Sequence, residues 1–548
     1  MFKPIDGGGA DKGGDPYGGV FFRAYRKLLE LCLRRRGLVV ALSLVLFAVA
    51  LYGFTKVDQS FFPPATRPQF MVDVFLPSGT HIHQSEAFAE VVEKHIRDQS
   101  GVTHVTSFIG GGGLRFLLVY SPEKENRAFV QFLVDTDNRT IIDGLIADIQ
   151  KYLDDQHPNA NAVAKKFLLG PGQGGRIQAR FRGPDPAVLR ELGVKARKVL
   201  DDDGHALCVR SDWRDREKVI RPDLLEFQAR RNGITRVELA QALESSFEGR
   251  MVGIYREPGR AGAGVYPQES RLLPIVARPP WDERSDVNAI RSLQIWSPVA
   301  RRMIPLNQVS SGTEVVWEDP IVVRRDRFPT LTVHADPRSG LPSQLFNRVR
   351  PKIEQIELPA GYSLEWGGEF QDAREARIAL AKPLPYALAL MVIIVVGLFN
   401  SIRATLLVWL IVPLAIIGVT GGLLVTGQPF GFMALLGVLA LGGEQIKNSI
   451  VVLSKIGAEI EQGKAPYEAI RDGCVSKVRP VLMVALTTVL GSIPLLSDPF
   501  FGTMAVCIMF GLSFACVLTL LVMPALYSIF FGVTEPATNA SSERQATP

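Results

Sequence analysis

The sequence predicts an α-helical membrane protein with six transmembrane helices and a large α+β region outside the membrane. Residues 58–382 are charged and mixed in composition, whereas the residues that follow are almost entirely apolar apart from glycine, proline and short charged loops. A separate apolar stretch, 37–55, precedes the mixed region and has about the length that spans a bilayer. Soluble and membrane parts therefore alternate along a chain of 548 residues, which is too long for one ordinary domain.

The bulk composition excludes several classes of function. The net charge of +6 comes without basic patches interleaved with aromatic residues, so it indicates membrane topology and not nucleic-acid binding. Of the five cysteines, only Cys208 lies outside the membrane-related segments, so a disulfide framework is not expected. The sequence has no P-loop, zinc spacing or nucleophile elbow, and we therefore predict neither an enzyme nor a protein with a cofactor or metal site.

The N-terminal 36 residues predict a cytoplasmic segment. Residues 1–19 are rich in glycine and resemble a flexible linker, because they lack the apolar core of a signal peptide. Residues 21–36 have the pattern of an amphipathic helix at the membrane surface and end in three arginines. By the positive-inside rule, these arginines keep the N-terminal side of the span at 37–55 in the cytoplasm.

Five further spans follow the external region, and both termini are then cytoplasmic, with a tail at 532–548. The predicted spans are 383–402, 404–427, 432–453, 480–496 and 503–531. Arg403 and a charged loop at 454–479 fall on the same side as the N-terminal arginines. Six glycines in these spans are predicted to allow close helix packing: Gly418, Gly421, Gly422, Gly437, Gly442 and Gly443.

The external region shows the order βαββαβ, which is the ferredoxin-like split βαβ plan. The first copy occupies 57–172. A second copy occupies 173–215 and 314–369, with a subdomain inserted at 216–313. Within the insert, a helix at 236–245 and a glycine-rich hairpin at 255–266 resemble an exposed arm that contacts another chain.

A lysine lies inside the predicted span 432–453. An ionisable group in hydrocarbon costs about 2.5–3.5 kcal/mol on insertion scales, and such groups usually face a bundle interior and carry ions, protons or substrate. Glu444 lies three residues before Lys447, on the same face of the helix, and Asn448 lies next to it. Lys447 is the best candidate for a proton-coupling residue; alternatively, it reaches the interface or neutralises a neighbour.

The layout and several short motifs resemble the C-terminal half of a resistance–nodulation–division (RND) efflux permease of the hydrophobe/amphiphile, or multidrug, branch. The motifs are LPSGT at 76–80, WGGE at 366–369, IKN at 446–448, GKAPYEA at 463–469 and VRPVLM at 478–483. The resemblance implies that the first two external units are porter subdomains and that the insert is a docking subdomain. It also implies a location in the bacterial inner membrane with a large periplasmic region.

A full subunit of this family has twelve helices in two halves, and this chain resembles helices seven to twelve. The family's proton-carrying aspartate pair lies in the first half, and no aspartate occupies the middle of a span here. The resemblance implies that Lys447 pairs with those aspartates and that Asn448 belongs to the same network. Glu444 departs from the family pattern, so it either neutralises Lys447 when the first half is absent or carries protons itself.

For the substrate, the resemblance implies a drug pocket beside the glycine run at 110–113. Gly111 would lie in a flexible switch loop, and Phe108 and Phe116 would form an aromatic wall. The alternative is a glycine-rich hairpin with core phenylalanines. The heavy-metal branch uses several methionines in this cleft, and the external region has only three, Met71, Met251 and Met303.

The predicted function is that of a C-terminal half or fragment of a proton-driven multidrug exporter. The resemblance implies small amphiphilic substrates, the N-terminal half as a partner, a trimer, a periplasmic adaptor and an outer-membrane channel. The alternatives are a scaffold or protein-export accessory without transport of its own, or a heavy-metal exporter. The chain is one product of a split gene, a fragment, or a self-assembling half-size transporter. The DNA upstream of Met1 would show whether a neighbouring reading frame encodes the first half.

Overall fold

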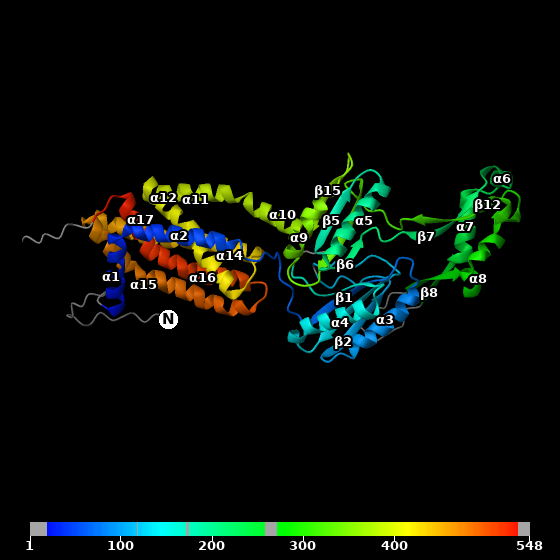
Figure 1. Ribbon diagram of the computed structural model, residues 1–548, viewed down its shortest axis with the longest axis horizontal. Helices are drawn as coiled ribbons and strands as arrows, with labels where there is room; N and C mark the ends of the chain where they lie inside the picture. Colours follow the sequence, from blue (N-terminus) through cyan, green and yellow to red (C-terminus); the bar gives the residue numbers. More distant parts are fainter. Residues whose placement is uncertain (1–18, 118, 171–174, 258–270, 535–548) are drawn as a thin grey trace, which may run out of the picture. The chain divides into compact units, whose positions relative to one another are not determined.

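A computed structural model describes residues 19–117, 119–170, 175–257 and 271–534 (Figure 1). The chain divides into two compact units. The first comprises the residues up to Trp213 and those from Ile321 onward, and it contains the membrane helices and two α/β sheets. The second unit is Arg214–Pro320.

Six helices in the described residues are long and apolar enough to cross a membrane. They are α2 (Arg36–Phe54), Glu369–Phe399 with α10 (Glu369–Ala381) and α11 (Leu384–Phe399), Ile402–Thr426 with α12 (Ile402–Ile411) and α13 (Ile416–Thr426), α14 (Phe432–Glu461), Pro466–Ser497 with α15 (Pro466–Ser492), and Gly502–Phe530 with α16 (Gly502–Val517) and α17 (Met523–Phe530). A one-turn π-helix, Leu518–Val522, joins α16 to α17. The preceding helix α1 (Val20–Arg34) is amphipathic, and its buried Tyr25 hydroxyl donates to the carbonyl of Leu520 at 2.8 Å.

The segment expected as a charged loop at 454–479 is mostly helical. Helix α14 continues to Glu461, and α15 begins at Pro466 and runs through Pro480. The Glu459 carboxylate explains part of this extension, because Lys455 on the same helix pairs with it at 2.7 Å. Only residues 462–465 lie between the two helices.

Two glycines account for the close approach of helices α13, α14 and α16. A Cβ at Gly418 of α13 would lie 2.6 Å from the carbonyl oxygen of Phe510, and a Cβ at Gly511 of α16 would lie 2.3 Å from a methyl of Leu441. In contrast, a Cβ at Gly421 would meet nothing within 4 Å. Close packing therefore explains some of the predicted glycines and not others.

The first α/β sheet has the strand order β2-β3-β1-β4 and is antiparallel throughout. Its strands are β1 (Gln69–Phe75), β2 (Val102–Ile109), β3 (Phe129–Thr136) and β4 (Asn161–Lys166). Helices α3 (Ile82–Arg97) and α4 (Ile142–Gln156) cover one face (Figure 1). Strand alternation sends Phe70 and Val72 under these helices and turns Met71 and Asp73 to the opposite face.

The second sheet has the order β13-β14-β5-β15, and β6 pairs with β14. The strands are β5 (Ile177–Arg182), β6 (Ala206–Ser211), β13 (Arg324–Arg325), β14 (Phe328–Pro337) and β15 (Ser363–Gly368). Helices α5 (Pro186–Asp203) and α9 (Pro342–Glu354) pack on it and bury a core that includes Phe181, Leu331 and the fully buried Trp213.

The second unit consists of two-stranded ribbons and short helices. Its strands are β7 (Glu217–Leu224), β8 (Arg250–Glu257), β9 (Arg271–Ala277), β10 (Gln294–Ser297), β11 (Arg302–Pro305) and β12 (Ser310–Glu318), and its helices include α6 (Glu226–Arg231), α7 (Arg236–Phe247) and α8 (Trp281–Ser285). Because β12 pairs with β7, residues 314–318 lie in this unit, whereas the sequence analysis assigned them to the second porter subdomain. Most of the hairpin expected at 255–266 lies outside the described residues; strands β8 and β9 pair on either side of it.

Candidate functional site

The charged pair in the membrane helices lies on an exposed face of α14. Lys447 Nζ is 2.6 Å from Glu444 Oε2, and the two side chains are 55 % and 37 % exposed in this chain. The one-turn spacing on a helix brings the two groups together. A charge pair on an open face of a membrane helix needs further polar partners or water, because hydrocarbon solvates neither ion.

The buried face of the same helix carries a separate polar group. Gln445 and Ser449 are fully buried, and Gln445 Nε2 donates to Thr519 Oγ1 of the π-helix at 3.1 Å. The structure places Asn448 on this buried face, where its Nδ2 has no hydrogen-bond partner in the described part of the chain, and not in a network with Lys447. Single π-helical turns are frequent at functional sites.

A second candidate site is a pocket between the two α/β sheets of the first unit. Its described lining is Met71, Asp73, Phe75, Leu117, Val119, Tyr120, Ser121, Glu123, Phe129, Gln131, Lys165, Lys166, Phe167, Leu168, Arg176, Arg210 and Asp336. The space inside it that water-sized molecules can reach measures about 90 Å³, and the pocket opens to solvent. We call it the porter pocket.

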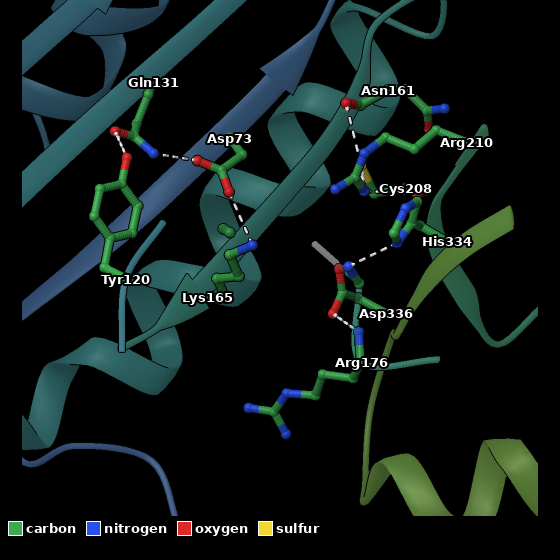
Figure 2. Close-up of polar contacts among 12 residues, drawn as sticks. Asp73, Tyr120, Gln131, Asn161, Lys165, Arg176, Cys208, Arg210, His334 and Asp336 are labelled. Carbon is green, nitrogen blue, oxygen red and sulfur yellow. Dashed lines mark hydrogen bonds and ion pairs between the residues drawn. The ribbon is translucent and has the colours of Figure 1, made fainter. Parts of the chain in front are cut away.

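Asp73 is the centre of the hydrogen-bond network on the first sheet (Figure 2). One carboxylate oxygen accepts from Gln131 Nε2 at 2.7 Å, and the other pairs with Lys165 Nζ at 2.8 Å. Gln131 Oε1 in turn accepts from the Tyr120 hydroxyl at 2.9 Å and from the backbone N–H of Gly113 at 3.0 Å. Asp73, Gln131 and Lys165 lie on the neighbouring strands β1, β3 and β4, which hold the three side chains on one face of the sheet.

A β-bulge in the second sheet positions Arg210 and Asp336. The register of β14 against β6 shifts between His334 and Asp336, and Cys208 opposite the shift has a positive φ of 51°. Bulges redirect side chains, and here both charged groups reach the pocket lining. Arg210 Nη1 donates to the carbonyl and sulfur of Cys208 at 3.3 and 3.2 Å, and its guanidinium lies 4.3 Å from the centre of the Phe75 ring.

One carboxylate oxygen in this group has no protein partner. Asp336 is 5 % exposed, and its Oδ1 accepts from the backbone N–H of Arg176 at 3.1 Å. Its Oδ2 is buried and has no hydrogen-bond donor among the described residues. A buried acceptor left alone costs about 1–3 kcal/mol, so it marks a position where water or a ligand completes the site.

The charge states around the pocket follow from its geometry. Burial acts to lower the pKa of Lys165, but the Asp73 and Asp336 carboxylates outweigh it and the pKa is raised, so the ammonium stays charged. Burial and the nearby cations Arg210, Arg180 and Lys165 hold the pKa of His334 well below its usual value, so this imidazole is neutral at pH 7. Its Nδ1 accepts from the backbone N–H of Gly175 at 3.2 Å.

The residues predicted for the drug pocket lie beside the porter pocket and are absent from its described lining. The Phe116 ring is 4.7 Å from the Tyr120 ring and 5.4 Å from the Phe167 ring, so it contacts two lining residues. Phe108 packs against Gly113, where an added Cβ would come within 2.9 Å of its ring. Gly111 is partly buried in the turn after β2.

The three external methionines belong to two different units of the chain. Met71 lines the porter pocket, whereas Met251 and Met303 belong to the second unit and are 60 % and 56 % exposed. The part of the chain that the structure describes contains no group of three or more His, Cys, Asp or Glu side chains placed to hold a metal ion.

Sequence reasoning missed the charged residues of the porter pocket. For Asp73 there was a signal, because a carboxylate in the middle of the apolar strand QFMVDVF needs a partner. Asp336 and Arg210 gave no comparable signal, since a bulge that pairs strands far apart in sequence positions them.

The six apolar helices and the pocketed α/β sheets are the architecture of a polytopic membrane transporter. The chain belongs to the AcrB/AcrD/AcrF family, whose model matches residues 20–531. This is a family of RND efflux permeases, which are multi-pass transporters of the inner membrane with a periplasmic region.

Several curated relatives are heavy-metal resistance proteins. The chain is 24 % identical to the cobalt-zinc-cadmium resistance protein CzcA of Cupriavidus metallidurans, covering 92 % of this chain and 48 % of the relative. It is 26 % identical to the nickel and cobalt resistance protein CnrA of the same organism, covering 95 % of this chain and 49 % of the relative. It is 20 % identical to the swarming motility protein SwrC of Bacillus subtilis, covering 98 % of this chain and 50 % of the relative.

The crystal structure of a heavy metal efflux pump has a similar fold, with a TM-score of 0.76 and 21 % identity over 93 % of this chain and 52 % of that one. The chain thus spans about half the length of the relatives that it matches. These comparisons support the RND family and do not support the multidrug branch that the motifs predicted. CzcA and CnrA are metal resistance proteins, and they fit the heavy-metal alternative.

Proposed function

We propose that this chain supplies the C-terminal half of a proton-driven RND exporter. The observation that carries the proposal is the Lys447–Glu444 pair, which lies on an exposed face of α14 in a chain half as long as its relatives. A second half that covered this face would bring carboxylates to Lys447, and protons taken up by those carboxylates would release the lysine. Glu444 holds the charge of Lys447 when that half is absent.

The porter pocket would receive the cargo on the periplasmic side of the inner membrane. The assembly would be a trimer that works with a periplasmic adaptor and an outer-membrane channel, as is general for RND permeases. Both termini of the chain would be cytoplasmic, since the arginines before α2 favour that side.

Two classes of cargo compete. The relatives CzcA and CnrA, which are cobalt-zinc-cadmium and nickel and cobalt resistance proteins, favour transition-metal cations. The composition of the porter pocket favours an organic compound, because it combines apolar walls with buried hydrogen-bonding groups and only one thioether, Met71.

The test is an efflux measurement in cells that lack their own RND pumps. Cells would carry this chain alone, an N-terminal half with the proton-carrying aspartate pair alone, or both. Export only with both halves, abolished when the proton gradient is collapsed, supports the proposal. Equal cargo accumulation under all three conditions would favour a scaffold or protein-export accessory instead.

A further inference from the structure

The porter pocket offers more hydrogen-bond donors than its own acceptors use. Lys165 has three N–H groups and one partner, Asp73. Arg210 directs Nη1 to Cys208 and retains its other N–H groups. The Arg176 guanidinium points away from Asp336 and has no hydrogen-bond partner in the described residues (Figure 2).

The acceptors of the pocket are largely occupied. Both oxygens of Asp73 have partners, and Glu123 also has one. The remaining lysine, Lys166, pairs with Asp143 outside the pocket at 2.6 Å. Asp336 Oδ2 is therefore the one lining carboxylate oxygen, among the described residues, that is buried without a donor.

Such an excess of donors suits a ligand whose head group is rich in acceptors. Carboxylates and sulfonates form short, charge-assisted hydrogen bonds with Arg and Lys. The rest of the lining is apolar and would enclose a hydrocarbon or aromatic body. These apolar residues are Met71, Phe75, Leu117, Phe129, Phe167 and Leu168.

The soft atoms near the pocket are not arranged for a transition metal. The thioether of Met71 stands alone, the Cys208 thiol donates to the carbonyl of Asn161 at 3.6 Å, and His334 Nδ1 already accepts a backbone N–H. Three cationic side chains would also repel a metal cation.

We propose that the porter pocket binds an organic anion with an apolar body. Its carboxylate or sulfonate accepts from Lys165, Arg210 and Arg176, and Asp336 Oδ2 accepts from a hydroxyl or amide on ligands that carry one. The identity of the pocket as a cargo site rests on the proposed export function, whereas binding of the anion does not.

Calorimetric titration of the full chain in nanodiscs tests this assignment with three probes: octanoate, octylammonium and Zn²⁺. Empty nanodiscs correct for partition of the two amphiphiles. Saturable binding of octanoate, with none for octylammonium and no displacement of octanoate by Zn²⁺, is expected. Tighter binding of octylammonium, or displacement of octanoate by Zn²⁺, would overturn the assignment, and this comparison needs no variant.

Variants locate the site. Arg176→Gln should weaken octanoate binding about tenfold or more, because it removes a cation whose guanidinium makes no hydrogen bond to the described residues. Asp336→Asn should leave octanoate binding intact or strengthen it. Arg97→Gln, a change on the exposed outer helix α3, is the matched control and should change nothing. Unaltered octanoate affinity in Arg176→Gln would refute the pocket as the site.

Binding and export fail separately in this design. If octanoate binds as described but paired halves export nothing, the anion assignment is supported and the export function is overturned. If paired halves export Zn²⁺ or another cargo and octanoate does not bind, the export function is supported and the anion assignment is overturned.

Discussion

Lys447 and Glu444 form an ion pair of 2.6 Å on one turn of α14, on a face that the rest of this chain leaves exposed. Within this chain, Glu444 thereby provides a negatively charged partner for the Lys447 ammonium. The short distance between the two charged groups favours neutralisation of Lys447 as the role of Glu444.

Glu444→Gln should leave export by the two-half assembly within about twofold, while the chain alone loses about 1 kcal/mol or less of stability. The measurement is proton-driven efflux in paired halves, alongside thermal unfolding of the single chain. Glu461→Gln at the end of the same helix is the control. Loss of efflux in Glu444→Gln would show instead that Glu444 carries protons.

Gly418→Ala should destabilise the membrane helices by about 1–3 kcal/mol, because the new methyl would lie 2.6 Å from the carbonyl oxygen of Phe510. Gly421→Ala on the same helix is a matched control, since nothing lies within 4 Å of its Cβ position. Thermal unfolding in detergent compares the two. Equal midpoints for both variants would contradict the close packing of α13 on α16.

Asp212 predicts a pH dependence in the second α/β sheet. Burial raises the pKa of Asp212 from 3.8 to about 6, although its Oδ1 accepts from the backbone N–H of Thr332 at 2.8 Å. An acid with a raised folded-state pKa stabilises the fold fully below pH 3.8 and loses that contribution as the pH rises through about 6. The loss amounts to roughly 3 kcal/mol for this shift.

Asp212→Asn keeps an oxygen acceptor for Thr332 and removes the titration. The stability of the variant relative to the wild type should therefore rise by about 2.4 kcal/mol between pH 4 and pH 7. Denaturant unfolding at a series of pH values measures this difference. A difference that stays constant over that range would show that Asp212 does not titrate there.

The pair of Asp73 and Lys165 should behave as a buried ion pair. Asp73→Leu alone leaves the ammonium uncompensated and should cost about 3–5 kcal/mol, whereas Asp73→Leu with Lys165→Met should recover most of the loss. Glu314→Gln breaks the exposed pair with Arg221 and should have no measurable effect. Additive losses in the double variant of Asp73 and Lys165 would contradict the coupling.

The sequence was informative where a local pattern determines the structure. The contrast between long apolar stretches and a charged, mixed stretch predicted membrane helices around an α/β region. The spacing of Glu444 and Lys447, three residues apart on one helix, placed both groups on the same face. Pro480 misled the prediction of α15, since the helix accommodates the proline and continues.

The porter pocket depends on tertiary structure and could not be predicted in this way. Asp336 and Arg210 come from strands more than a hundred residues apart, and a bulge turns them into the lining. Phe116 was expected in the wall of a drug pocket, and its ring packs against Tyr120 of the porter pocket lining because of the conformation of the loop after β2. Neither outcome follows from spacing along the chain.

The most direct test is proton-coupled export by paired halves with wild-type or Lys447→Met chain in proteoliposomes with an imposed pH gradient. Export that needs both halves and is lost in Lys447→Met is the predicted result. Export by this chain alone, or undiminished export by the Lys447→Met assembly, would contradict its role as the lysine-bearing half of a proton-driven permease.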